Sequence, residues 1–144
     1  MKLSTKSRYG LRAMLEIALQ SGEEPVSIRY IAERQNISEA YLEQLMAKLK
    51  KTGLIESHRG SQGGYVLARD ASLITVGDVL RSLEGSLEAA TCPGMEGDGS
   101  CEGSDVCVTK VVWKRINEGI AQAVDSMTLS QLAQESRKAR QESA

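Results

Sequence analysis

The pattern of apolar and polar positions along the chain predicts a mainly helical protein. Apolar residues return every three or four positions in several stretches, as they do on one face of an α-helix. Ser27, Ser38 and Thr75 each stand directly before such a stretch, where a hydroxyl can cap the first helical turn. Helices are therefore expected over about residues 7–20, 27–35, 38–51, 75–84 and 108–127, followed by a short capped helix from Thr128 and a frayed end.

The middle of the first half has the pattern of a helix-turn-helix. Only Asn36 and Ile37 separate the second predicted helix from the third. After the third helix, residues 54–57 and 65–67 are typical of two short strands, and the stretch between them is rich in glycine, as in a hairpin. The expected fold class is mainly α with a small β-hairpin wing: a winged helix-turn-helix domain followed by a long helix.

The third predicted helix has two contrasting faces. Leu42, Leu45, Met46 and Leu49 share one face and are expected to pack on the first two helices. The opposite face combines small side chains, which permit close approach to DNA, with an amide that can pair with adenine and lysines that can reach phosphates. An ordinary solvated polar face is the alternative. Arg59, at the hairpin tip, is placed to enter a narrow minor groove, or is an ordinary exposed turn residue.

Together these elements define a set of candidate DNA-binding residues: Lys6, Ser38, Ala40, Tyr41, Glu43, Gln44, Lys48, Lys51, His58, Arg59, Gly60 and Ser61.

The total charge conceals a division that bears on DNA binding. The 144 residues include 18 Lys and Arg against 19 Asp and Glu, a net charge of −1, whereas DNA-binding domains are usually basic. Residues 1–69, however, hold 11 basic and 7 acidic residues, a net charge of +4, and residues 70–144 hold 7 and 12, a net charge of −5. The basic front half is therefore suited to phosphate.

Membrane proteins and enzymes are disfavoured by the sequence. No stretch approaches the roughly 18 apolar residues of a membrane span, and no apolar signal core follows the charged N-terminus. There is one histidine, and no phosphate-binding or dinucleotide-binding glycine motif. We expect a cytoplasmic protein that is not an enzyme and has no membrane partner.

The three cysteines lie in one glycine-rich, acidic stretch. Eight residues separate Cys92 from Cys101, and five separate Cys101 from Cys107. Structural zinc sites usually pair cysteines two to four residues apart, whereas a [2Fe–2S] cluster tolerates wider spacing because its ligands are divided between two irons. A cluster, a zinc ion, free thiols and a disulfide between Cys92 and Cys101 are the alternatives.

The predicted long helix after the cysteines is apolar over a broad arc that includes Val112, Trp113 and Ile116. An arc this wide exceeds what one side of a small domain covers, so this helix is expected to pack on its own domain and on a partner subunit. The expected divisions are residues 1–84 for DNA binding, 85–107 for the cysteines, and 108–144 for dimerisation and a C-terminal helix.

Four segments carry a resemblance to a known family: residues 2–10 (KLSTKSRYG), 31–34 (IAER), 38–45 (SEAYLEQL) and 59–65 (RGSQGGY). They resemble the Rrf2 family of bacterial transcription regulators. The resemblance implies a homodimer on a pseudo-palindromic operator of double-stranded DNA, with recognition helices in successive major grooves and wings in adjacent minor grooves. Glu43 matches a glutamate that, in cluster-binding members, tunes discrimination between operator classes.

The resemblance also favours a [2Fe–2S] cluster, because cluster-binding members carry three cysteines in the same loop. One such member has a histidine three residues after the last cysteine, where this chain has Lys110, a poor ligand when protonated. Asp98, Glu102, Asp105, a water or an external thiol are the candidates for the fourth ligand.

Two functions follow as expectations. The first is a repressor, with activation also open, whose operator binding follows iron–sulfur, redox or nitric oxide status. The alternative is a cluster-independent repressor of cysteine and sulfur metabolism that responds to a thiol, a metabolite or a partner enzyme.

Overall fold

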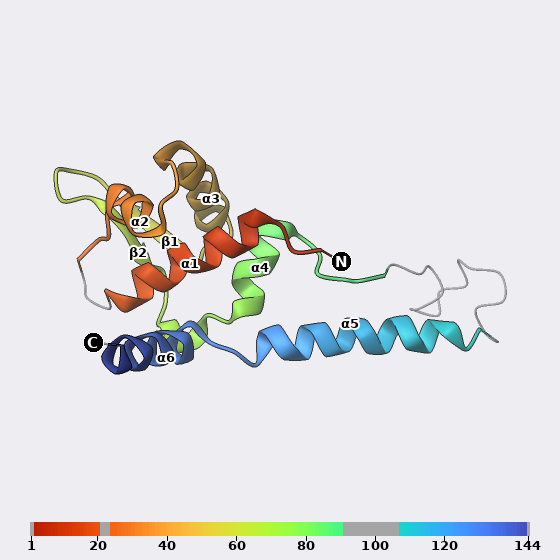
Figure 1. Ribbon diagram of the computed structural model, residues 1–144. Coiled ribbons are helices and arrows are strands. Elements are labelled where there is room, and N and C mark those ends of the chain that lie inside the picture. The colour runs from red at the N-terminus through yellow and green to blue at the C-terminus, as the bar shows by residue number, and fades with distance from the viewer. Residues whose placement is uncertain (1, 21–23, 91–106, 144) are drawn as a thin grey trace.

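The computed structural model describes residues 2–20, 24–90 and 107–143 (Figure 1). Within these ranges the mainly helical fold and the hairpin expected from the sequence are confirmed. The elements are α1 (Thr5–Leu19), α2 (Ile28–Gln35), α3 (Glu39–Lys51), β1 (Ile55–His58), β2 (Gly64–Leu67), the 3-10 turn η1 (Ala71–Leu73), α4 (Val76–Glu84), α5 (Thr109–Asp125) and α6 (Leu129–Glu142).

Hydroxyl caps start the helices where the sequence predicts them. The Ser27 side chain accepts a hydrogen bond from the backbone N–H of Tyr30 at the start of α2. Thr75 and Asp78 form a complete capping box on α4, in which each side chain binds the other residue's backbone N–H. Between α2 and α3, Asn36 takes a left-handed conformation with φ 53°, which asparagine tolerates better than most residues. This residue makes the turn of the helix-turn-helix.

The wing is an antiparallel hairpin that is attached to the segment before α2. Its strands pair from Ile55 with Leu67 to His58 with Gly64. Val26 adds a short bridge, with its N–H 2.9 Å from the Tyr65 carbonyl oxygen and its own carbonyl oxygen 2.8 Å from the Tyr65 N–H. A Cβ at Gly64 would collide with the Val26 carbonyl, so only glycine permits this close approach.

One main hydrophobic core joins α1 to the helix-turn-helix, the wing, α4 and α6. Met14 of α1, Ile31 of α2 and Met46 of α3 are fully buried in it. Figure 1 shows α1 running through the centre of the molecule, with α2 and α3 on one side and α6 on the other.

The last helix differs from the expectation of a short helix with a frayed end. Helix α6 has 14 residues, ends at Glu142 and lies against α1. Leu129 and Ala133 are buried in the main core, and the Arg137 guanidinium donates a hydrogen bond to the Leu19 carbonyl oxygen at 3.2 Å. Packing against α1 therefore stabilises α6 as a helix, although its sequence is mostly polar.

Helix α5 extends away from this core (Figure 1). It is 17 residues long, and none of its residues is buried. Its second half contacts the core through Ile120 and Val124, which pack with Val76, Leu80 and Leu87 in a small second cluster. The apolar residues of its first half are exposed. None of the described helices combines the length and apolar content of a membrane span.

Candidate nucleic-acid interface and cysteine segment

The two faces predicted for the third helix are confirmed in α3. Leu42, Leu45, Met46 and Leu49 are buried, which fixes how the helix is rotated against the core. Its opposite side is therefore turned to solvent and carries small, polar and charged groups. The exposed residues on it include Ala40, Glu43, Gln44, Ala47, Lys48 and Lys51.

Two of the candidate DNA-binding residues of α3 also hold the helix in place. The Ser38 hydroxyl caps α3 by accepting a hydrogen bond from the backbone N–H of Tyr41 at 3.2 Å. The half-buried Tyr41 ring meets Tyr9 of α1 edge to face, with ring centroids 6.1 Å apart, and the Arg12 guanidinium lies 5.6 Å from the Tyr9 ring centroid. These contacts orient α3 on α1, while a contact of Ser38 or Tyr41 with DNA stays a prediction.

The wing brings a second group of candidates to the surface. His58 ends β1, and Arg59, Gly60 and Ser61 form the exposed turn that follows. The Lys50 ammonium donates a hydrogen bond to the Ser57 hydroxyl at 2.7 Å and so joins α3 to β1.

Glu43 links α3 to the wing electrostatically. Burial raises the pKa of the Tyr65 phenol on β2, and the negative charge of Glu43 raises it further. Glu43 itself is exposed on α3. Lys6 is exposed on the first turn of α1.

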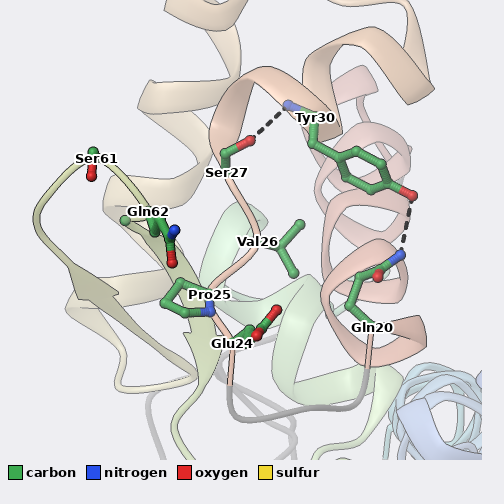
Figure 2. Close-up of a pocket in the computed structure, with 9 residues that line it drawn as sticks. Gln20, Glu24, Pro25, Val26, Ser27, Tyr30, Ser61 and Gln62 are labelled. Carbon is green, nitrogen blue, oxygen red and sulfur yellow. Dashed lines mark hydrogen bonds between the residues drawn. The ribbon is translucent and has the colours of Figure 1, made fainter.

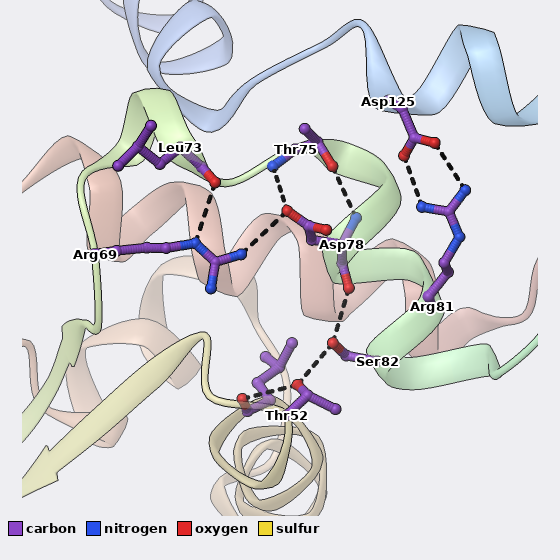
Figure 3. Close-up of polar contacts among 9 residues, drawn as sticks. Thr52, Arg69, Leu73, Thr75, Asp78, Arg81, Ser82 and Asp125 are labelled. Carbon is purple, nitrogen blue, oxygen red and sulfur yellow. Dashed lines mark hydrogen bonds and ion pairs between the residues drawn. The ribbon is translucent and has the colours of Figure 1, made fainter.

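A chain of polar contacts joins α3 to α4 and α4 to α5 (Figure 3). The Thr52 hydroxyl, at the C-terminal end of α3, lies 2.7 Å from the Ser82 hydroxyl on α4. On the other side of α4, Arg81 donates two hydrogen bonds to the Asp125 carboxylate, of 2.6 and 2.9 Å. These bonds hold the pKa of Asp125 below its ordinary value. A Cβ at Gly77 would collide with the Asp125 carboxylate, so glycine leaves room for this pair.

A second contact ties the first turn of α1 to the end of α4. The Glu84 carboxylate accepts hydrogen bonds from the hydroxyls of Ser4 and Ser7, the latter at 2.8 Å, and from the Ser4 backbone N–H at 3.1 Å. These bonds hold the pKa of Glu84 below its ordinary value. Neither set of contacts is predictable from the sequence, because their partners lie 30 to 80 residues apart and leave no short-range pattern.

The cysteine segment lies largely outside the described residues. Cys92 and Cys101 fall in the undescribed range 91–106, as do Asp98, Glu102 and Asp105. Cys107 stands just before α5 and is half-buried, with its sulfur 3.1 Å from the Thr109 hydroxyl oxygen. Hydrogen bonds from the Thr109 hydroxyl and from the backbone N–H groups of Lys110 and Thr109 lower the pKa of the Cys107 thiol. This environment favours the thiolate.

In the ranges that the structure describes, no three His, Cys, Asp or Glu side chains gather as a metal site, but these ranges hold only one of the cysteines.

A cleft of about 470 Å³ opens between the end of α1, the start of α2 and the wing (Figure 2). Gln20 and Tyr30 line one side of it and are joined by a hydrogen bond of 3.0 Å from the amide to the phenol oxygen. Glu24, Ser27 and Ser61 are among its lining residues, and no histidine is among those described. The described lining therefore lacks a nucleophile beside a histidine base.

The known proteins that this chain resembles are transcriptional regulators, in agreement with its winged helix-turn-helix fold. Residues 3–135 match the Rrf2 family, described as an iron-dependent transcriptional regulator. The chain is 45% identical over 132 residues to the HTH-type transcriptional regulator IscR of Yersinia enterocolitica, which covers 92% of this chain and 79% of that protein. The IscR of Serratia proteamaculans is 46% identical over the same shares.

Two solved structures extend the comparison. The structure of CymR (YrzC), the global cysteine regulator of B. subtilis, aligns with a TM-score of 0.78 at 40% identity and covers 94% of this chain and 98% of that one. T. potens IscR aligns with a TM-score of 0.75 at 45% identity, covering 96% and 90%. With its winged helix-turn-helix and these matches over nearly its whole length, the chain belongs to the Rrf2 family of transcriptional regulators.

Proposed function

We propose that this protein is a dimeric, sequence-specific regulator whose operator binding is controlled by a [2Fe–2S] cluster held by Cys92, Cys101 and Cys107. The proposal that the protein binds DNA is supported above all by one observation: α3 has an exposed polar face beside an exposed wing tip. In this proposal residues 1–84 bind DNA, residues 85–107 hold the cluster, and residues 108–144 supply the dimerisation helix and the C-terminal helix.

The surface of α3 supports a role in the major groove. Ala40 and Ala47 leave room for the helix to approach base edges, and Gln44 can make paired hydrogen bonds to adenine. Lys48 and Lys51 lie beside these residues on α3 and can reach phosphates, as can Lys6 from α1. Arg59 and the small residues Gly60 and Ser61 fit a narrow minor groove on the other side of the backbone.

The exposed apolar residues of α5 support dimerisation. Val111 and Val112 are 59% and 50% exposed, Trp113 and Ile116 are 39% and 42% exposed, and Val108, directly before the helix, is 79% exposed. An uncovered apolar strip of this kind on a long helix favours a second copy of the same strip. A dimer also fits a pseudo-palindromic operator, because two equal recognition helices then meet two equal half-sites.

The chemistry of Cys107 fits a thiolate-bound cluster. A metal ligand has to be the deprotonated thiolate, and the hydrogen bonds at the head of α5 favour that form. A bound [2Fe–2S] cluster would supply an iron centre that responds to oxidants, nitric oxide and iron supply. Zinc is disfavoured by the spacing of the three cysteines.

The contacts among α5, α4 and α3 support a route by which the cysteine segment can bias DNA binding. Cys107 directly precedes α5, Asp125 near the other end of α5 binds Arg81, and Ser82 beside it binds Thr52 at the end of α3. In this proposal, a change in the position of α5 shifts α4 and α3 through these polar contacts. DNA binding changes only as far as the two arrangements differ in affinity for the operator.

The test begins with anaerobic purification. Two irons and two sulfides per chain, with visible absorption, are expected for the wild type, and none of these for the triple variant Cys92→Ala, Cys101→Ala, Cys107→Ala. Operator affinity or selectivity is expected to differ between the loaded protein and both the cluster-free protein and the triple variant. Equal binding by all three forms would refute control by a cluster.

The structural likeness to CymR favours a second candidate, a cluster-independent repressor of cysteine and sulfur metabolism. In this case a thiol, a metabolite or a partner enzyme would change operator binding. A colourless, iron-free protein from anaerobic purification, with operator affinity that responds to cysteine or its precursors, would support it over the first proposal.

A further inference from the structure

The side chain of Asn117 on α5 holds the chain directly before the cysteine segment. Its Oδ1 accepts hydrogen bonds from the backbone N–H groups of Ala89 at 2.8 Å and Ala90 at 3.4 Å. Its Nδ2 donates to the carbonyl oxygen of Ala90 at 2.9 Å. Since one amide group binds both the N–H and the C=O of Ala90, it fixes the position and the direction of the backbone at this residue.

The chain reaches this contact while running toward the head of α5. Leu87 is buried in the small cluster that includes Ile120 and Val124, and Ala89 and Ala90 then lie beside Asn117, one turn nearer the start of the helix. Cys107 stands at that same start. The Asn117 contact therefore directs residues 89 and 90, which lead into the cysteine segment, toward the end of α5 where Cys107 lies.

Only short lengths of chain and helix separate this contact from Cys92 and from the head of α5. Thr109 and Asn117 are eight residues apart on α5, which corresponds to about 12 Å along the helix axis. Cys92 follows Ala90 by two residues, and two residues of chain span at most about 7 Å. The anchor at Asn117 therefore lies on the half of α5 that leads toward Cys107, and it holds the backbone of Ala89 and Ala90 by hydrogen bonds that need no ligand.

We propose that Asn117 is a positioning residue for the cluster: it holds the entry of the cysteine segment against α5, so that ligand binding does not have to order residues 89 and 90. This inference rests on the proposed function, because it requires the cysteines to bind a cluster. Asn117 itself is not a ligand, since its amide is engaged with the backbone.

The experiment compares Asn117→Ala, Asn117→Asp and the control Gln122→Ala, which truncates another amide of α5. Alanine favours helix more than asparagine does, so loss of α5 does not account for an effect of Asn117→Ala. In the cluster-free protein, Asn117→Ala is expected to speed amide exchange at Ala89 and Ala90 about tenfold, as loss of one or two neutral hydrogen bonds does.

In the anaerobically loaded protein, the same variant is expected to lose iron to a chelator about tenfold faster, with changed visible circular dichroism. Asn117→Asp keeps the acceptor oxygen and loses the donor, so its values are expected between those of Asn117→Ala and the wild type. Gln122→Ala is expected to behave as the wild type does.

Three results would overturn the inference. Exchange and iron loss in Asn117→Ala equal to the wild type would show that the contact holds nothing. Faster exchange with unchanged iron loss would show that the contact does not serve the cluster. A wild-type protein that binds no iron or sulfide would refute the proposed function and this inference together, whereas the first two results leave the proposed function standing.

Discussion

At the scale of single residues, Glu16 shows how a charge can be accommodated inside the core. Its side chain lies on the apolar face of α1 and is only 2% exposed. Its Oε1 accepts a hydrogen bond from Gln35 at 2.9 Å and lies 3.5 Å from the Arg140 guanidinium, while its Oε2 lies 3.7 Å from Nε of Arg34. A buried carboxylate is costly unless cations and donors surround it. Oε2 accepts no hydrogen bond among the described residues and is compensated by the nearby Arg34 cation alone, so Glu16 joins α2 and α6 to α1 mainly through charge.

This arrangement predicts non-additive effects of mutation. Arg140→Ala is expected to lower the free energy of unfolding by about 1–2 kcal/mol, because the buried carboxyl group of Glu16 then loses one of its two cationic neighbours. In a Glu16→Gln background the same substitution is expected to cost close to nothing. Urea unfolding of the two single variants and the double variant measures the coupling, and equal costs of Arg140→Ala in both backgrounds would contradict it.

At the scale of elements, α5 differs from the other helices in how little of it the chain covers. The core holds its second half through Ile120 and Val124, while its first half exposes valines, Trp113 and Ile116. Sequence alone predicts a helix here and an apolar arc. The fold decides which part of the arc the chain itself covers and which part is left exposed.

Charging the exposed strip of α5 is expected to break the dimer. Val112 and Ile116 lie one turn apart on the same face, so Ile116→Lys places an ammonium where the partner's apolar strip would pack. Sedimentation equilibrium is expected to show a dissociation constant at least about 100-fold weaker than that of the wild type. Glu118→Lys, on the other side of the helix, is the control. A dimer of Ile116→Lys as tight as that of the wild type would place the interface elsewhere.

At the scale of the whole molecule, net charge misleads because the halves differ. The chain carries −1 in total, but residues 1–69 carry +4, and these include α3 and the wing. The proposed dimer would present this basic half twice to one duplex. The strength of binding to any DNA and the choice of sequence are therefore expected to depend on different side chains of α3.

Substitutions at Lys48 and Gln44 separate these two contributions. Lys48→Ala is expected to weaken binding to operator and random duplexes alike and to reduce the slope of log affinity against log salt by about 1 per subunit. Gln44→Ala is expected to keep that slope and to lose about 1–3 kcal/mol of discrimination at one base pair in each half-site. Fluorescence anisotropy over a range of salt concentrations measures both, and an unchanged slope in Lys48→Ala would remove Lys48 from the phosphate contacts.

Much of the fold could be predicted because it depends on neighbours in the chain. The caps at Ser27, Ser38 and Thr75 each act within three residues, and the buried face of α3 follows from helical periodicity. The structure differs most at α6, whose helix depends on burial of Leu129 and Ala133 against distant elements. The candidate DNA-binding residues are located on α1, α3 and the wing, but Ser38 and Tyr41 have packing roles that periodicity does not reveal.

Local patterns in the sequence are enough to predict most of the helices, the hairpin, the exposed face of α3 and the family to which the chain belongs. Each of these follows from local hydrogen bonding, from the period of apolar residues or from motifs of a few residues. Only the tertiary structure decided that Glu16 is buried between Arg34 and Arg140, that Thr52 meets Ser82, and that Asn117 holds Ala89 and Ala90. These partners lie 18 to 124 positions apart, and contacts over such separations depend on how whole helices pack.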